Sequence, residues 1–196
     1  MNIGSQELID ELTQMTRNHL NVAQELLQLD TEELNSKSDP KSWSILECLE
    51  HLNRYGHFYI PEIEKQINQS SHQPTAYFRS YLLGDYFAKS MLPREKLNKM
   101  KTFKSMNPLG SQLDQSSIQE FIDQQQQLLS LLEQSRKVNL HKTKTRISIS
   151  NWIKLKLGDT LRVVIYHNYR HLIQIERIRQ EHAAVKYNPK QERFQK

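Results

Sequence analysis

Apolar residues recur every three or four positions in four stretches of the chain, the spacing that puts them on one face of an α-helix. These stretches predict four long amphipathic helices, over residues 6–29, from a cap at Ser42 or Ser44 to about Gln66, 117–133 and 159–182. Pro61 lies well inside the second of them and predicts a kink or a break there, because proline removes a backbone donor and crowds the preceding turn.

Two of the predicted helices carry polar residues suited to capping their first turn. Ser44 is followed three residues later by Glu47, the spacing of a capping box in which each side chain bonds the other's backbone N–H. Asp159 or Thr160 is the expected N-cap of the last helix.

The segment between the second and third predicted helices, residues 68–116, is the least regular part of the chain. Prolines, glycines and serines interrupt it, and only one short helix is predicted, around residues 79–90. Residues 138–150 alternate weakly between apolar and polar types and predict a short extended segment or a loop.

This order of elements predicts an all-α fold, a four-helix bundle with a long crossover between helices 2 and 3. A crossover of this length is expected where two neighbouring helices run parallel. We expect a single domain over residues 1–185 and a polar C-terminal tail over residues 186–196. The composition agrees, since five glycines in 196 residues are too few for a turn-rich all-β fold.

Charge is distributed unevenly along the chain, although the net charge is only +5. Residues 137–196 contain 14 Lys or Arg against 4 Asp or Glu, and residues 1–136 contain 13 against 18. A basic C-terminal third of this kind is typical of a solvated surface, and it is also compatible with an anionic substrate or RNA.

The chain has the features of a soluble cytoplasmic protein. Cys48 is the single cysteine, so no intrachain disulfide forms and a reducing compartment fits. The N-terminus lacks the basic and apolar regions of a signal peptide. No apolar run approaches the roughly 20 residues that a membrane-spanning helix requires.

The strongest chemical signal is a pair of histidines in the last predicted helix. His167 and His171 are four residues apart, so both imidazoles leave the same helix face about one turn apart, a geometry that suits metal chelation. His51, in the second predicted helix next to core-facing positions, is the candidate third ligand. Three imidazoles would leave a coordination position for water or substrate and would suit zinc, nickel or another divalent ion of similar character.

Two motifs around these histidines resemble the DinB-like (YfiT-like) metalloprotein superfamily. One is Trp43 to Leu52, in which Trp-Ser leads into a helix that carries a histidine before a leucine. The other is the run Gly158 to Gln174, which contains His-xxx-His-xx-Gln. The resemblance implies an up-down-down-up bundle that binds a divalent metal through His51, His167 and His171. The family includes thiol S-transferases that use thiols such as bacillithiol, mycothiol-dependent isomerases and members without an assigned reaction, and it is often dimeric.

Four residues beside the predicted ligands are candidates for a second shell or for the pocket wall. Glu47 lies one turn before His51 and either orients its imidazole or completes the helix cap. Cys48 either lines the site or fills the core, and Arg170 either meets an anionic substrate or forms a surface ion pair. Gln174 follows His171 by three residues and is placed to support it. We expect Trp43 and Tyr55 to lie in the core, and the remaining histidines to lie at the surface: His19, His57, His72, His141 and His182.

The sequence therefore predicts a divalent-metal-binding protein that acts on a small molecule, expected to be a homodimer without a membrane partner. As an enzyme it would activate either a low-molecular-weight thiol, as an S-transferase of the bacillithiol-transferase type, or water, as a hydrolase. No catalytic residue beyond the metal ligands is assigned. The alternative is a non-catalytic, metal-stabilised bundle that serves as a sensor or interaction module. Nucleic-acid binding through the basic third is less favoured, because aromatic and basic residues are not interleaved there as in RNA-binding modules.

Overall fold

Helices make up most of the computed structural model, which describes residues 1–93 and 102–186. The helices are α1 (Ser5–Leu26), α2 (Thr31–Asn35), α3 (Ile45–Asn68), α4 (Leu82–Met91), the short 3₁₀-helix η1 (Lys104–Met106), α5 (Ser116–Ser135) and α6 (Leu157–Lys186). The strands are β1 (Asn2–Gly4), β2 (Tyr77–Arg79), β3 (Lys144–Ile147) and β4 (Ser150–Lys156).

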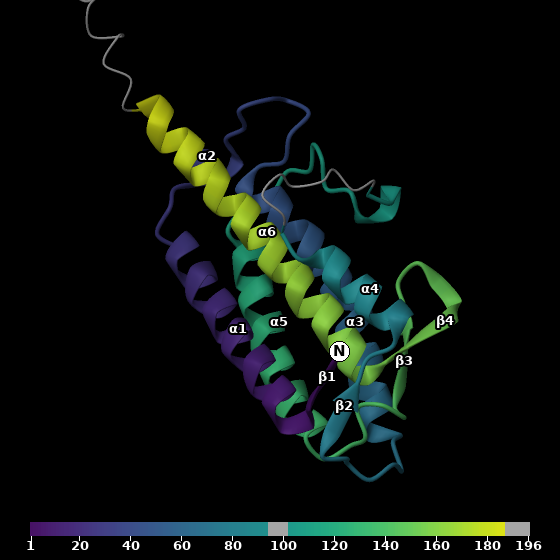
Figure 1. The fold of residues 1–196 in the computed structure, drawn as a ribbon. Helices are drawn as coiled ribbons and strands as arrows, with labels where there is room; N and C mark the ends of the chain where they lie inside the picture. The colour runs from purple at the N-terminus through teal and green to yellow at the C-terminus, as the bar shows by residue number, and fades with distance from the viewer. Residues whose placement is uncertain (94–101, 187–196) are drawn as a thin grey trace, which may run out of the picture.

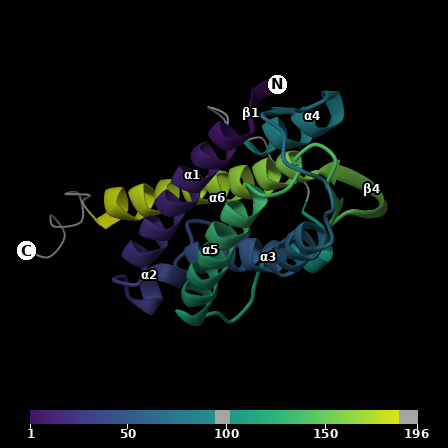
Figure 2. The ribbon, with the colours of Figure 1, turned by 90° about the horizontal axis from the view of Figure 1, so that it is seen from below.

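The four long helices α1, α3, α5 and α6 form the predicted bundle, and each contacts two neighbours around a square (Figures 1 and 2). Helix α1 packs on α5 and α6, and α3 packs on the same two helices from the opposite corner. The order is up-down-down-up, so α3 and α5 run parallel and the chain between them crosses the length of the bundle (Figure 1). The four-helix bundle and its long crossover are therefore confirmed.

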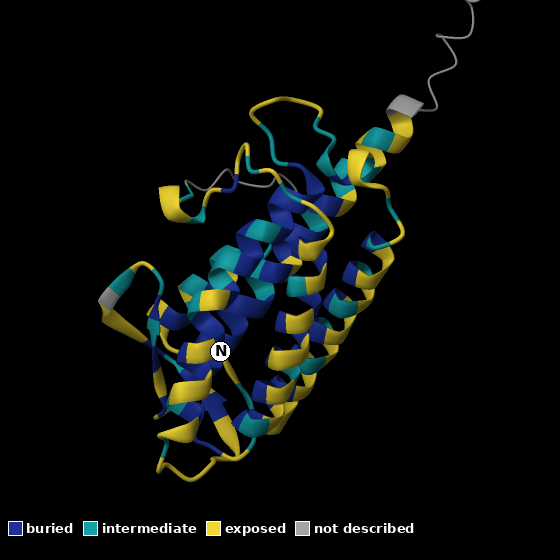
Figure 3. Cartoon of the chain, turned by 180° about the vertical axis from the view of Figure 1, so that it is seen from behind, coloured by how far each residue is buried: buried dark blue, intermediate teal, exposed yellow. Residues whose placement is uncertain are grey.

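The buried residues form a continuous stripe along the inner side of each long helix, as Figure 3 shows. Two large apolar clusters fill the space between the helices, one toward each end of the bundle. In α1 the stripe includes His19, which is only 2% exposed, so the expectation that His19 lies at the surface is wrong.

Helix α3 begins as the sequence predicts. The Ser44 side chain accepts a hydrogen bond from the backbone of Glu47, and the Glu47 carboxylate accepts one from the backbone of Ser44, which makes a complete capping box. Pro61 does not break the helix, which continues to Asn68.

Two short antiparallel sheets close one end of the bundle. Strand β1 pairs with β2, and β3 pairs with β4 in a hairpin that leads directly into α6. Strand β3 is the short extended segment predicted within residues 138–150, and its pairing with β4 in a hairpin was not predicted. Strand β4 runs directly into α6, which begins at Leu157. Asp159 and Thr160 therefore lie inside the first turn of the helix, and the prediction that one of them is the N-cap is wrong.

Helix α4, which belongs to the crossover, is fixed against α6 by a buried ionic cluster. Arg162 is 2% exposed and pairs with Asp85 of α4 and with Asp159 of its own helix. Ser80 donates a further hydrogen bond to Asp159. A buried guanidinium that is held by two carboxylates restricts the position of α4 along α6.

Within the described residues no helix is both long and apolar enough to cross a membrane. The predicted C-terminal tail lies, apart from Lys186, outside the described residues.

Candidate metal centre

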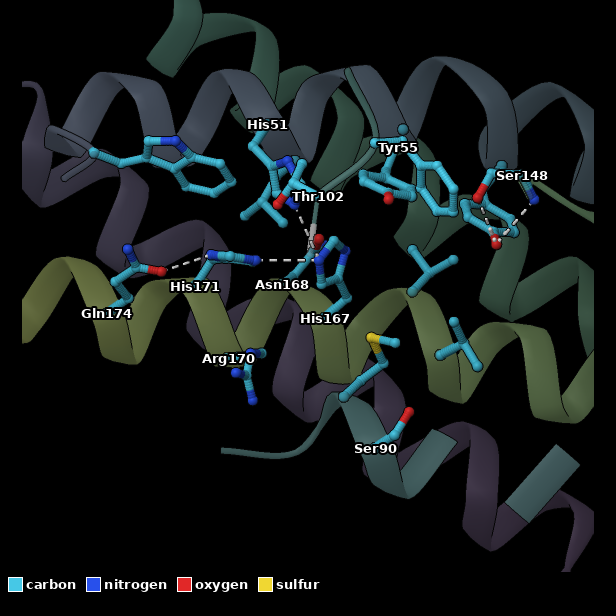
Figure 4. A pocket seen from close by; sticks show the side chains of 18 of the residues that line it. His51, Tyr55, Ser90, Thr102, Ser148, His167, Asn168, Arg170, His171 and Gln174 are labelled. Atoms are coloured by element: carbon cyan, nitrogen blue, oxygen red, sulfur yellow. Dashed lines mark hydrogen bonds between the residues drawn. The ribbon is translucent and has the colours of Figure 1, made fainter. Parts of the chain in front are cut away.

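The three predicted ligand histidines converge between α3 and α6 (Figure 4). Nε2 of His167 lies 3.3 Å from Nε2 of His51 and 3.1 Å from Nε2 of His171. The candidate donor atoms of the three residues all lie within 4.8 Å of one another. Ligands about 2.0–2.1 Å from a tetrahedral zinc ion are about 3.3 Å apart, so the observed separations suit a shared divalent cation.

The opposite ring nitrogens of two of these histidines are held by acceptors. Nδ1 of His51 lies 2.7 Å from the carbonyl oxygen of Met106, and Nδ1 of His171 lies 3.0 Å from Oε1 of Gln174. A neutral imidazole that donates from Nδ1 keeps its lone pair on Nε2. Both lone pairs therefore point toward Nε2 of His167, where a single proton could satisfy only one of them.

Burial keeps the three rings neutral, the state in which imidazole binds a metal. His51 and His171 are 3% and 7% exposed. Loss of hydration lowers the pKa of His51 to about 4 and the pKa of His171 to about 3. The pKa of His167 also falls well below its usual value, mainly through burial and then through the neighbouring histidines.

Two aromatic residues flank the histidine cluster. The indole of Trp43 lies 4.6 Å from the ring of His51 and 5.7 Å from that of His171, measured between ring centroids. Tyr55 places its ring edge-on to His51 and His167, at 5.0 and 4.8 Å. Both rings restrict the rotamers of the histidines and exclude water from the sides of the cluster. Trp43 and Tyr55 pack against the core, as expected, but both are only partly buried. Both also line a cavity beside the histidines.

The segment around η1 holds His51 in place, and no sequence motif indicated this. Besides the Met106 carbonyl, it provides the carbonyls of Ser105 and Asn107, which accept hydrogen bonds from Arg54 of α3. The Asn107 side chain accepts a further bond from the indole N–H of Trp43. A crossover segment some fifty residues away in sequence therefore orients the first candidate ligand.

The four predicted neighbours of the ligands separate into two pairs. Gln174 contacts His171 as expected and lines the cavity, and Arg170 also lines it. Glu47 instead caps α3 and accepts hydrogen bonds from Lys37 and the Gly110 backbone, so it does not orient His51.

The remaining neighbour, Cys48, is fully buried in the apolar core, where burial raises the pKa of its thiol. It does not line the cavity. Within the described chain the metal-type group contains three histidines and neither a carboxylate nor a thiolate, so coordination positions remain for exogenous ligands.

A cavity of about 1190 Å³ opens beside the histidines. Helices α3, α4 and α6 and the β3–β4 hairpin contribute its walls, and Thr102 and Phe103 approach it from the crossover. Neither α4 nor the hairpin could be assigned to the site from the sequence, because neither carries a recognisable motif.

Fold and site together define an up-down-down-up helical bundle with a three-histidine, metal-type centre between its second and last long helices. The family model of the DinB superfamily matches residues 11–175, and the chain belongs to this superfamily.

One solved structure with a similar fold is that of YfiT from Bacillus subtilis, described as "a probable metal-dependent hydrolase with an unusual four-helix bundle topology". The TM-score is 0.52 at 12% sequence identity, over 89% of this chain and 87% of YfiT. At this identity the likeness shows the fold. The comparison with curated proteins found no match.

Proposed function

We propose that this chain is a metal-dependent enzyme that binds a divalent cation through His51, His167 and His171. The observation that carries the proposal is the convergence of three imidazole Nε2 atoms, two of which have their lone pairs directed inward by acceptors at Nδ1. Zinc or nickel suits such a donor set.

A divalent ion held there would lower the pKa of a coordinated water or thiol and polarise an electrophile. The chain contributes the rest of the site. Met106 and Gln174 fix two of the imidazoles, which raises their basicity as ligands. Trp43 and Tyr55 shield the cluster, and the cavity admits a small molecule to its open side.

Two reactions fit this centre. Activation of water would make the protein a hydrolase, the activity that the description of YfiT gives for that protein. Activation of a low-molecular-weight thiol would make it an S-transferase, in line with the resemblance to thiol transferases. The cavity volume of about 1190 Å³ exceeds the ~300–1,000 Å³ of common ligand pockets, which favours a site for both a thiol and its electrophile.

Metal content of the purified protein tests the proposal. We expect the wild type to bind about one equivalent of zinc or nickel and the variants His51→Ala and His167→Ala to bind far less. His72→Ala is the control, because His72 is exposed and lies outside the cluster. A wild type that binds no divalent ion, or a His72→Ala variant that loses as much metal as the other two, would refute the site.

The choice between the two reactions requires an activity measurement. The metal-loaded protein would be assayed with a chromogenic aryl ester and with an electrophilic arene, each with and without a low-molecular-weight thiol. Turnover of the arene that requires the thiol supports S-transfer, and turnover of the ester without thiol supports hydrolysis. If neither substrate class is turned over beyond the rate of the His167→Ala variant, the enzymatic proposal fails.

A further inference from the structure

The cavity beside the histidines has an apolar end, and its position follows from the two helices that carry the ligands. Helices α3 and α6 run antiparallel, so residues after His51 and residues before His167 lie toward the same end of the bundle. Tyr59 and Val163 line the cavity in that direction, eight residues after His51 and four before His167. Since four residues rise about 6 Å, this wall begins roughly 6 Å from the ligands and extends to about 12 Å.

Helix α4 and the hairpin close the apolar end from the other side. Phe87 and Met91 of α4 are partly buried and pack on Ile147, Leu155 and Val163, which are nearly fully buried. All five residues line the cavity. We call this part of the cavity the apolar compartment; its walls are Tyr59, Phe87, Met91, Ile147, Leu155 and Val163.

Two polar side chains beside the apolar compartment, Ser90 and Tyr59, are engaged within the protein. The Ser90 hydroxyl donates a hydrogen bond to the carbonyl oxygen of Phe87. The Tyr59 hydroxyl accepts a hydrogen bond from the backbone N–H of Ser148 and also lies 3.3 Å from the Ser148 hydroxyl (Figure 4). At the opposite end of the cavity, by contrast, the wall includes Lys41, Gln174 and Arg177. The histidine cluster therefore lies between a polar end and an apolar end.

We propose that the substrate is a small amphiphile whose reactive group meets the metal centre and whose alkyl or aryl arm occupies the apolar compartment. The chemical class of the arm follows from these six walls, which offer aliphatic and aromatic surface at one to two helical turns from the candidate ligands. The inference rests on the proposed function for the position of the reactive group, and the arm is recognised by the chain alone.

A ladder of n-alkyl hydroxamic acids, from acetohydroxamic to octanohydroxamic acid, tests the proposal by calorimetric titration of the zinc-loaded protein. The hydroxamate end chelates metals, and the alkyl end probes the compartment. We expect the dissociation constant to fall about two- to fourfold for each added methylene, since burial of a methylene contributes up to about 0.8 kcal/mol. Across the ladder the affinity should rise at least about 60-fold.

Two substitutions on α4 locate the effect. Phe87→Asp places a charge in the compartment and should remove most of the dependence on chain length. Leu82→Asp is the matched control, because Leu82 is 92% exposed on the same helix and lies outside this cavity. If Phe87→Asp does not fold, Val163→Phe replaces it: the larger ring fills the compartment and should weaken octanohydroxamate binding while acetohydroxamate binding stays unchanged.

The same ladder on metal-free protein separates this inference from the proposed function. Binding would be followed by fluorescence of Trp43, which lines the cavity, in a Trp152→Phe background. Affinity that rises with chain length in a protein that takes up no metal would refute the metal centre and support the compartment. A flat ladder on zinc-loaded protein, or an equal slope in Phe87→Asp and wild type, would overturn the proposal while leaving the metal centre intact.

Discussion

The stability of the metal-free protein should depend on the protonation of His19. This residue lies on the buried side of α1, and its ring stacks on that of Tyr169 of α6, with centroids 6.3 Å apart. Burial lowers the pKa of His19 from 6.5 to about 4, and the nearby Gln125 side chain opposes this only in part. Within the described residues neither ring nitrogen reaches the geometry of a full hydrogen bond, so the Gln125 side chain compensates a proton on His19 only in part.

The direction of the pH effect on stability follows from the pKa of His19 in the folded and in the unfolded protein. The unfolded chain protonates His19 below about pH 6.5, whereas the folded protein does so only below about pH 4, so the unfolded state binds more protons between these values. The contribution of His19 to stability is therefore fully present above pH 6.5 and is lost as the pH falls toward 4. At about 1.4 kcal/mol per pH unit, the loss is about 3 kcal/mol, a large part of the stability of a typical domain.

The variant His19→Phe keeps a ring against Tyr169 and removes the titration. Urea unfolding of metal-free protein, followed by circular dichroism from pH 7.5 to 4.5, would give the free energy of unfolding of both proteins. The difference between wild type and variant should shift by about 2–3 kcal/mol in favour of the variant as the pH falls. His51, His167 and His171 remain in both proteins, so their titration cancels in this difference.

His72→Phe is the control, because His72 is exposed. The difference in unfolding free energy between wild type and this variant should not change with pH. A difference between wild type and His19→Phe that stays constant across this pH range would refute the reasoning, since it would mean that His19 is protonated as readily in the folded state as in the unfolded chain.

Three further predictions concern the support of the site and of the bundle. Gln174→Leu, which removes the acceptor for His171, should weaken zinc binding about 10- to 100-fold in a competition titration, whereas Gln180→Leu on the outer face of the same helix should not. Gly56→Ala would place a methyl group 1.8 Å from Oε1 of the buried Gln124 side chain and displace its amide from the Asn53 carbonyl. The loss of this buried hydrogen bond, up to about 3 kcal/mol, should exceed the gain of about 1 kcal/mol in helix propensity in urea unfolding, and an unchanged midpoint would contradict this. Ser44→Ala should lower the unfolding free energy by about 1 kcal/mol through loss of the α3 cap, and a neutral result would show that the cap is dispensable.

The features that the sequence predicted correctly depend on residues close together in the chain. The capping box of Ser44 and Glu47 and the contact between His171 and Gln174 each join residues three positions apart. Helical geometry alone brings such residues together, so their spacing is sufficient evidence. The four long helices follow for the same reason, since the apolar period is a local property.

The apolar period of α1 contains a signal for the burial of His19. The buried residues of α1 continue through it at intervals of three and four: Leu12, Thr16, His19, Ala23 and Leu26. The lack of an identifiable partner in the sequence suggested the surface, but the position of His19 in the stripe predicts the core. Periodicity was the better guide here, because the helix face fixes the direction of the side chain and its polarity does not.

Other features depended on partners that are distant in sequence. Asp159 has the residue type of an N-cap and lies at the start of the apolar period in the sequence. In the structure its carboxylate contacts Ser80 and Arg162, and β4 continues the backbone directly into α6 two residues earlier. The acceptor for His51 is a backbone carbonyl, that of Met106, which any residue type would provide. No pattern of side chains could have identified it.

The topology of the bundle explains why the least predictable segment also builds the site. Because α3 and α5 run parallel, the chain must return along the bundle between them, and two described parts of this crossover pack on the ligand-bearing pair, α4 on α6 and η1 on α3. The crossover supplies the Met106 carbonyl to His51 of the candidate metal centre, and Phe87 and Met91 to the proposed apolar compartment. The two helices that carry the candidate ligands can thus be recognised from their motifs, whereas Phe87 and Met91 of the proposed compartment lie in the crossover, whose packing is determined only by the folded bundle.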